Sequence, residues 1–359
     1  MLIRTFRNDE FIDREEEISF LIDWFKETPK EILWLYGPKS CGKTTLIEYV
    51  VEKELFEDFE NLKPKENYWV RYVNLRGKLI SSYETFLESF IKPKDEEEIK
   101  KTKSFSARVS ASIIQIEAGL LKEVKERKKD LFDVLLNKFE NISKEGKQPI
   151  LIIDEIQTLE DIYINGDREL LKEFLNFCVR LTKETHLSHV IILSSNTIFI
   201  NKIYNEAKLK ITSYFKKVDH LDKKTTLEYL KLHNIPEEKH SLVWDYLGGC
   251  IPLIQRMIRH KDKYSSIEDY LNEQVNLALS EIREIMKRFL TKEEKNIFKN
   301  IAKQIIKDGF YISSENETQE NLRVIDLMSE KEILFYDPQT GAITPNNRVY
   351  LKAMEKMLS

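Results

Sequence analysis

Residues 32–46 read ILWLYGPKSCGKTTL, and this stretch decides the fold. Residues 32–36 are apolar or aromatic and predict a buried strand, whereas the apolar spacing of residues 46–51 predicts a helix. Between them, GPKSCGKT at Gly37–Thr44 matches the pattern G-x-x-x-x-G-K-[ST] at every fixed position. The backbone N–H groups of such a loop and the dipole of the following helix converge on a phosphate. The complete match with both flanks favours a phosphate-binding loop over a glycine-containing turn before a surface helix.

Two side chains of this loop have specific roles in the motif. Lys43 is expected to reach the β- and γ-phosphates as a catalytic group, and the hydroxyl of Thr44 is expected to bind Mg²⁺. Cys41 sits inside the loop, where we expect a tolerated small side chain rather than a reactive thiol. The other residues that we expect to hold the phosphate groups are Gly37, Pro38, Lys39, Ser40, Gly42 and Thr45.

A second motif, ILIIDE, occupies residues 150–155. Four aliphatic residues followed by two acids predict a buried parallel strand with an acidic carboxyl end. In a phosphate-loop protein this is the Walker B pattern. Asp154 is then expected to hold the Mg²⁺ shell, and Glu155 to polarise the attacking water. The alternative for Glu155 is a structural acid at a strand end.

Further strands are predicted at residues 68–75, 190–196 and 214–221, so residues 1–221 predict an α/β core with a parallel sheet. The strand at 190–196 ends in small polar residues. We expect Asn196 to contact the γ-phosphate or the water there, the role called sensor 1, with Ser195 as the reserve. The alternative is that Asn196 only starts the next loop. Asp13 is expected to cap the helix that follows it.

The pattern becomes helical after residue 221. Residues 222–287 predict a helical lid, with LGGC at 247–250 ending one of its helices. In residues 288–359, helices are followed by a hairpin around DPQTG at 337–341, which predicts a winged helix. Within the core we also expect a short helix at 83–91, an exposed charged loop at 92–103 and a strand or hairpin insertion at 105–124.

The composition excludes several classes of protein. The net charge of −4 argues against a protein that coats nucleic acid non-specifically. The three cysteines (41, 178 and 250) are far apart, have no metal-ligand spacing and fit a reducing compartment. No apolar signal core or run of about 18 apolar residues occurs. We therefore expect a soluble, cytoplasmic protein without a membrane partner.

Four residue groups together resemble the archaeal ATPase family, within the signal-transducing (STAND) branch of AAA+-like phosphate-loop NTPases. They are FIDREEEI at 11–18, GPKSCGKT at 37–44, LIIDEIQ at 151–157 and LGGCIP at 247–252. The resemblance implies ATP rather than GTP, and an adenine pocket lined by Phe11, Ile12, Arg14 and, from the lid, Pro252. Two departures stand out. Two residues separate the Gly-Gly pair from Pro252, where similar proteins often have one. Lysines (208, 210, 216 and 217) occupy the segment that commonly carries an arginine, so the arginine finger is unassigned and an oligomer in which a neighbour supplies one stays open.

These patterns lead to one main hypothesis and two alternatives. The main hypothesis is a Mg²⁺-dependent ATPase switch that hydrolyses ATP to ADP and phosphate and controls a winged helix that binds DNA or a protein. The first alternative is an ATP-gated DNA-binding factor resembling origin-recognition initiators, which would use the terminal hairpin and its neighbouring helix. The second is a nucleotide or small-molecule kinase, against which the large helical C-terminal portion argues.

Overall fold

The computed structural model describes residues 3–7, 9–59, 63–65, 68–75, 85–86, 131–160, 162–164, 168–206, 209–260, 263–313 and 317–359. The expected loop at 92–103 and the expected strand or hairpin at 105–124 lie outside these residues, as does most of the expected helix at 83–91. Within the described part of the chain, no helix is both long enough and apolar enough to cross a membrane.

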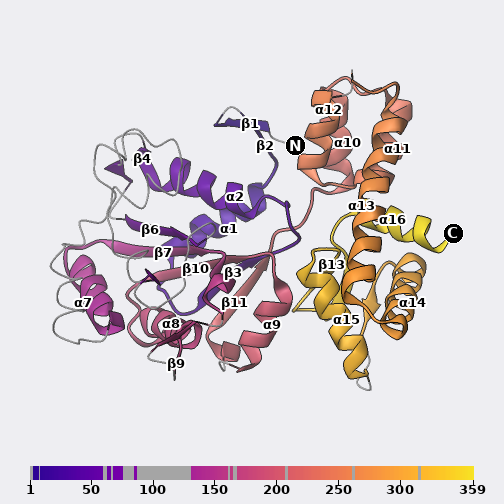
Figure 1. Ribbon diagram of the computed structural model, residues 1–359. Coiled ribbons are helices and arrows are strands. Elements are labelled where there is room, and N and C mark those ends of the chain that lie inside the picture. The colour runs from indigo at the N-terminus through magenta and orange to yellow at the C-terminus, as the bar shows by residue number, and fades with distance from the viewer. Residues whose placement is uncertain are drawn as a thin grey trace.

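A parallel sheet of five strands forms the centre of the first two thirds of the chain (Figure 1), as predicted. Its strands, in spatial order, are β11 (Ser213–Lys217), β3 (Ile32–Tyr36), β10 (His189–Ser194), β7 (Gln148–Asp154) and β6 (Tyr68–Asn74). β10 therefore separates β3, which leads into the phosphate loop, from β7, which ends in Asp154. In the register, Ser194 pairs with Tyr36, and Leu193 pairs with Asp154.

Helices cover both faces of this sheet because alternate residues of each strand point to opposite faces. Leu33 and Leu35 pack with the helices α1 (Glu15–Lys26) and α2 (Lys43–Tyr49). Ile32 and Trp34 pack on the other face, with α7 (Leu131–Lys144), α8 (Leu170–Val179) and α9 (Thr197–Glu206). The smaller elements of the core are the helical turns Val50–Leu55, Ile156–Leu159, Arg180–Glu184 and Leu209–Ile211, and the strands β4 (Phe56–Asp58), β5 (Lys63–Pro64), β8 (Tyr163–Ile164) and β9 (Arg168–Glu169).

The N-terminal segment forms a hairpin that the sequence reading did not include. Its strands are β1 (Ile3–Phe6) and β2 (Asp9–Ile12), paired antiparallel. The prediction that Asp13 caps α1 is wrong: the cap position is held by Arg14, without a side-chain cap bond. The carboxylate of Asp13 instead accepts a hydrogen bond of 3.4 Å from Thr225 Oγ1, so it is turned toward the helices beyond the sheet.

After β11 the chain forms helices, as expected: α10 (Lys223–Leu232), α11 (Glu237–Leu247), α12 (Ile251–His260) and α13 (Ile267–Phe289). The C-terminal unit follows: α14 (Lys292–Asp308), β12 (Tyr311–Ile312), α15 (Gln319–Glu330), β13 (Leu334–Tyr336), β14 (Ala342–Pro345) and α16 (Arg348–Leu358). Its strands form an antiparallel sheet in the order β12-β14-β13. The expected helices and hairpin are therefore present, while their assignment to a winged helix stays a prediction, as do the domain boundaries.

The C-terminal unit packs on both of the preceding parts of the chain. α13 and α16 share one hydrophobic cluster with α10, α11 and α12. On the other side, Phe335 of β13 is buried in the cluster of the α/β core, although its neighbour Leu334 belongs to the helical cluster. In Figure 1 the β13 region accordingly lies between α9 of the core and the helices of the C-terminal unit. This packing brings the end of the chain to the phosphate loop.

Candidate nucleotide-binding site

The phosphate loop connects β3 to α2 and depends on glycine at both of its fixed positions. Gly37 has a φ of 155°, and a Cβ there would lie 1.9 Å from the carbonyl oxygen of Val218. Gly42 has a φ of 97°, in the left-handed region that side chains disfavour. The loop is therefore fitted against the end of β11, and Val218 N–H donates to Tyr36 O at 2.8 Å in the same place.

Lys43 lies buried inside this loop. Its ammonium group donates to the carbonyl oxygens of Gly37 and Pro38, both at 2.9 Å, and lies 3.6 Å from Cys41 Sγ. Only 8% of the residue is exposed. Because an ammonium group has three donors, the loop carbonyls hold this cation next to the position where a phosphate would bind.

Thr44, in the first turn of α2, meets Asp154, the last residue of β7, across the end of β10. Thr44 Oγ1 donates to Asp154 Oδ2 at 3.1 Å, and the hydroxyl of Tyr72 donates to the same oxygen at 3.0 Å. Burial raises the pKa of Tyr72, so its hydroxyl remains a donor at neutral pH. The sequence analysis did not predict a role for Tyr72. Its place in the strand is the relevant signal, because Asn74, two residues later in β6, pairs with Asp154.

The donor set around Asp154 fits Mg²⁺. A hydroxyl and a carboxylate are hard oxygen ligands, and Mg²⁺ keeps several waters while binding substrate phosphates. It needs no dedicated protein cage, and the described residues contain no group of three or more His, Cys, Asp or Glu side chains that could form one. Thr44 and Asp154 are the residues that would hold the ion.

Glu155 follows Asp154 directly and turns the chain away from the sheet. Its φ is 62°, and its carboxylate accepts a hydrogen bond from the side-chain amide of Gln157. The residue is half-buried. It therefore lies at the carboxyl edge of the sheet, beside the Thr44–Asp154 pair.

The end of β10 lies between the loop and Asp154, where a sensor was expected. β10 ends at Ser194, and its hydroxyl bonds to the backbone of Asn196. Asn196 Oδ1 accepts from Phe199 N at 3.0 Å, at the start of α9. Asn196 is thus the cap of a helix, and only its amide nitrogen remains to act as a sensor. Ser195, the reserve, is half-buried between the two.

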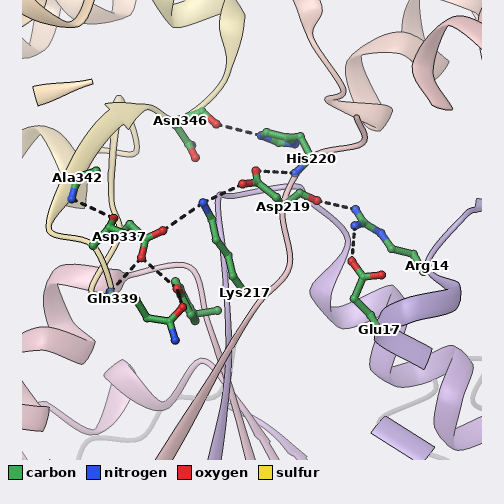
Figure 2. Close-up of polar contacts among 11 residues, drawn as sticks. Arg14, Glu17, Lys217, Asp219, His220, Asp337, Gln339, Ala342 and Asn346 are labelled. Atoms are coloured by element: carbon green, nitrogen blue, oxygen red, sulfur yellow. Dashed lines mark hydrogen bonds and ion pairs between the residues drawn. The ribbon is translucent and has the colours of Figure 1, made fainter. Parts of the chain in front are cut away.

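Arg14 joins the N-terminal segment to the loop. Its guanidinium donates to Cys41 O at 2.8 Å. It also donates to Asp219 O at 2.7 Å and forms an ion pair with Glu17 at 2.9 Å (Figure 2). Arg14 itself has a φ of 82°. The predicted adenine-side residue therefore contacts the phosphate loop and the segment after β11 together.

The other residues expected around adenine occupy different surroundings. Phe11 is buried and stacks on Tyr49 of α2, with ring centroids 4.5 Å apart. Ile12 is buried among the helices of α10–α13, whereas Pro252 is exposed in the first turn of α12. The two segments meet where Gln255 of α12 donates to Glu10 O at 3.4 Å. The adenine assignment itself stays a prediction.

The Gly-Gly pair of the helical segment allows a close approach of two backbones. A Cβ on Gly249 would lie 1.8 Å from the carbonyl oxygen of Leu221. Gly249 O accepts from Leu221 N–H at 3.1 Å. Gly248 has a φ of 58°, and its α-carbon faces the side chain of Arg348. These glycines therefore fix the α11–α12 turn against the exit from the sheet.

The outer side of the phosphate loop is bound by the C-terminal unit, which the sequence reading did not anticipate. Lys39 N–H donates to Asn346 Oδ1 at 3.0 Å, and the Lys39 ammonium pairs with Glu332. The side-chain amide of Asn346 also donates to Glu332 O, and the backbone carbonyl oxygen of Asn346 accepts from His220 Nε2 at 3.0 Å. A cavity of about 470 Å³ lies beside these contacts; Pro38, His220, Gly248, Asn346 and Arg348 are among its lining residues.

A charged network anchors the same face (Figure 2). The Lys217 ammonium points between Asp219, at 2.8 Å, and Asp337, at 3.2 Å. Asp337 also accepts from the buried hydroxyl of Tyr36 at 3.0 Å. Burial alone lowers the pKa of Lys217, but the two carboxylates outweigh it and raise that pKa. Burial lowers the pKa of His220, which is therefore neutral at pH 7.

Glu48 of α2 is a titratable group near the site whose pKa is shifted toward neutral pH. Burial raises its pKa to about 7, with a further contribution from the charges of Asp154 and Glu52. Its ion pair with Arg7, at 2.7 Å, acts in the opposite direction. The carboxyl group therefore changes its charge near neutral pH.

Comparison with known proteins agrees with this site. Residues 11–257 match the model of an ATPase domain found predominantly in Archaea. An uncharacterized ATP-binding protein of Methanocaldococcus jannaschii is 33% identical over 366 residues, covering 97% of each chain. Another from Pyrococcus abyssi is 31% identical over 358 residues, covering 97% of this chain and 98% of the relative. Among solved structures, a Walker-type ATPase of Pyrococcus abyssi aligns over 98% of both chains at 16% identity, with a TM-score of 0.65, a likeness of fold. The predicted archaeal ATPase resemblance is confirmed, and the chain belongs to this family of ATPase domains.

Proposed function

We propose that this chain is a Mg²⁺-dependent ATPase that hydrolyses ATP to ADP and phosphate and works as a nucleotide-controlled switch. The observation that carries the ATPase proposal is the 3.1 Å hydrogen bond between Thr44 Oγ1 and Asp154 Oδ2, next to the buried ammonium of Lys43. The ATP-binding names of the relatives support the choice of nucleotide. The STAND assignment rests on LGGCIP at 247–252 and on the C-terminal helices and hairpin.

In this proposal the loop exchanges its internal bonds for bonds to the nucleotide. Lys43 leaves the carbonyl oxygens of Gly37 and Pro38 and binds the β- and γ-phosphates, while Thr44 and Asp154 hold Mg²⁺. When bound, the metal would supply positive charge beside the phosphoryl oxygens, where negative charge develops during hydrolysis. Glu155 orients the attacking water, and the amide of Asn196 contacts the water or the γ-phosphate.

Adenine is proposed to bind between the N-terminal segment and the helical lid of residues 222–287. The hydrogen bond from Gln255 to Glu10 O supports this, because it brings the helix of Pro252 next to the strand of Phe11. The packing of Ile12 among the lid helices supports it too. Arg14 would couple the conformation of the phosphate loop to this pocket, because its guanidinium is bonded to Cys41 O of the loop.

The switch rests on the contact between Lys39 N–H and Asn346 Oδ1. Backbone N–H groups of a phosphate loop are its phosphate donors, and here one of them is occupied by the C-terminal unit. Nucleotide binding that reshapes the loop would weaken this bond and the neighbouring Lys39–Glu332 pair. The C-terminal unit, the proposed winged helix, would then be released from the core.

Hydrolysis is tested with Glu155→Gln, which keeps the shape of the side chain and removes the base. We expect turnover to fall at least about 100-fold while ATP binding persists, so that ATP stays bound after gel filtration. Glu184→Gln, an exposed change on the same core, is the matched control. Unchanged turnover in Glu155→Gln would overturn the assignment of Glu155.

The switch is tested with Asn346→Ala. This change removes two side-chain hydrogen bonds, of which only the one from Lys39 N–H joins the C-terminal unit to the phosphate loop. That bond is worth about 1 kcal/mol, so we expect turnover or the rate of ATP binding to rise roughly three- to tenfold. Limited proteolysis should cut the C-terminal unit faster, with and without ATP. Asn272→Ala, an exposed change on α13, is the control. Equal proteolysis of both variants and the unmodified protein would contradict the switch.

A further inference from the structure

The outer face of α14 has a regular arrangement of positive charge. Lysines recur every fourth residue, at 295, 299, 303 and 307, and amide side chains accompany them at 296, 300 and 304. The opposite face, which includes Phe298, Ile301 and Ile305, is buried in the C-terminal unit. Between Lys295 and Lys307 the helix carries no Asp or Glu, although the whole chain has a net charge of −4.

These four lysines have no ion-pair partner among the residues that the structure describes. Three acids of α13 and α14 are engaged with other partners. Glu294 pairs with Arg323, Glu284 pairs with Arg288, and Glu281 accepts the hydroxyl of Tyr350 at 2.8 Å. The remaining acids of α14, Glu293 and Asp308, lie beyond the ends of the row. The positive charge is therefore not neutralised locally.

A groove between α13 and α14 extends the same surface. Arg283 and Lys287 of α13 face Lys295 and Lys299 of α14 across a cavity of about 310 Å³, and Met286 and Met357 complete its lining. Neither Arg283 nor Lys287 has an ion-pair partner in the described part of the chain. Figure 1 shows α14 on the side of the C-terminal unit that is remote from the parallel sheet. We call these six cations, with the amides of α14, the α13–α14 face.

We propose that the α13–α14 face binds the phosphate backbone of nucleic acid. Four residues of helix rise about 6 Å, so the lysine row spans roughly 18 Å and presents a line of charges to a linear polyanion. Lysine and arginine neutralise phosphates with release of counterions, and asparagine and glutamine add hydrogen bonds to phosphate or sugar oxygens. The contacts involve no base edges, so binding is independent of sequence.

Other partners fit this face less well. A membrane-surface helix needs an apolar face free to enter the lipid, and the apolar face of α14 is buried. A groove that binds an acidic protein usually has aromatic or large aliphatic side chains at its centre. Among the described residues, the only apolar side chains that line this groove are those of Met286 and Met357. The regular spacing of the charges favours a polyanion with a regular repeat.

The proposed site differs from the hairpin and neighbouring helix that the sequence suggested for DNA. The β13–β14 hairpin is occupied, because Phe335 is buried in the α/β core and Asp337 binds Tyr36 and Lys217. In α15, the cation Arg323 is paired with Glu294. Nucleic acid can therefore reach the α13–α14 face without displacing the C-terminal unit from the core.

The test compares two fourfold variants of the full chain that change the net charge equally. One carries Lys295→Gln, Lys299→Gln, Lys303→Gln and Lys307→Gln. The control carries Lys26→Gln, Lys144→Gln, Lys183→Gln and Lys231→Gln, all at exposed lysines on other elements. Binding of a labelled duplex of random sequence is measured by fluorescence anisotropy from about 50 to about 200 mM salt. Both variants should retain the thermal unfolding midpoint and the ATP turnover of the unmodified protein.

We expect the unmodified chain and the control to bind the duplex with a steep salt dependence. The α14 variant should bind at least tenfold more weakly at the lowest salt, and its slope of log K against log salt should fall by roughly 3 to 4. Poly-glutamate and inorganic phosphate serve as competitors, and neither should displace the duplex at equal charge concentration. No binding at low salt, equal slopes for the two variants, or displacement by either competitor would overturn the proposal.

Discussion

The two sides of the phosphate loop are held by different parts of the molecule. On the inner side, Lys43 and Thr44 bind the carbonyl oxygens of their own loop and the carboxylate of Asp154, all within the α/β core. On the outer side, Lys39 binds Asn346 and Glu332, which lie in the C-terminal unit about 300 residues later. The inner contacts are those that phosphate and Mg²⁺ would replace. The outer contacts are those through which a change in the loop would reach the end of the chain.

This difference separates chemistry from control. A side chain on the inner side can act only on the nucleotide, since its partners are loop carbonyls and strand ends. A side chain on the outer side can alter the position of the C-terminal unit without touching a phosphate. Substitutions on the two sides should therefore have effects of different size and of opposite sign on turnover.

The largest difference is expected between the two lysines of the loop. Lys43→Ala removes the cation that would bind the β- and γ-phosphates, and we expect nucleotide binding or turnover to fall by about 100- to 1,000-fold. Lys39→Ala removes only the pair with Glu332, which is partly exposed and worth about 0–1 kcal/mol. Its turnover should stay the same or rise slightly. ATP binding by calorimetry and phosphate release measure both.

Equal losses in Lys43→Ala and Lys39→Ala would break the distinction between the two sides. Thermal unfolding of both variants without nucleotide is the control for folding. Lys43 is buried against carbonyl groups, so Lys43→Met, which keeps the length of the side chain, separates the loss of charge from the loss of packing.

The second effect is a pH dependence on the inner side. Burial raises the pKa of Glu48 to about 7 from 4.5, so the folded protein keeps a proton that the unfolded chain releases between these values. The sign follows from linkage: stability is fully present below about pH 4.5, falls as the pH rises to about 7, and is constant above. Arg7, Glu52 and Asp154 surround the group.

We expect the free energy of unfolding to fall by about 2 kcal/mol between pH 5 and pH 8 through this group, on the order of 1.4 kcal/mol per pKa unit. Glu48→Gln should remove most of this slope, because the amide does not titrate in that range. Urea unfolding at the two pH values measures it. The same slope in both proteins would show that Glu48 is ionised in the folded state throughout.

How far the site could be predicted depended on the distance between partners along the chain. GPKSCGKT and ILIIDE are local patterns, and they identified Lys43, Thr44 and Asp154 as neighbours in space because parallel strands end at one edge of a sheet. Tyr36 and Asp337 are 301 positions apart, and the sequence around either residue does not predict a contact with the other. Asn346 was likewise invisible, since its role depends on how the C-terminal unit packs.

The fold followed the same rule. The strands were predicted from apolar runs and the helices from their periodicity, and those that fall on the described residues agree with the structure within a few residues. The β1–β2 hairpin was missed because its strands are short and mixed in character. Asp13 has the residue type and the position of a helix cap, but its carboxylate accepts a hydrogen bond from Thr225 of α10 instead. The local helix-capping rule therefore fails where a residue that is distant in the sequence binds the same side chain.

The third effect tests the outer side through one hydrogen bond. Tyr36→Phe removes the buried hydroxyl that donates to Asp337, and Asp337→Ala removes the acceptor and a partner of Lys217. We expect costs of about 1 kcal/mol and about 2–3 kcal/mol in the free energy of unfolding. A double-mutant cycle should give a coupling of about 1 kcal/mol. Strict additivity would show that this bond does not hold the C-terminal unit to the core.

The smallest effect concerns Asn196, whose two ends have different tasks. Asn196 Oδ1 caps α9, and a serine caps a helix about as well, so Asn196→Ser should change stability by only a few tenths of a kcal/mol. The substitution also removes the amide nitrogen. If this group contacts the water or the γ-phosphate, one hydrogen bond is lost and hydrolysis should fall about tenfold, while ATP binding stays unchanged. Ser195→Ala is the paired variant. A loss of hydrolysis in Ser195→Ala alone would move the sensor role to Ser195, and no loss in either would leave Asn196 as a helix cap. The result would decide whether the inner side of the site extends across β10, because this strand is the element that separates the phosphate loop from Asp154.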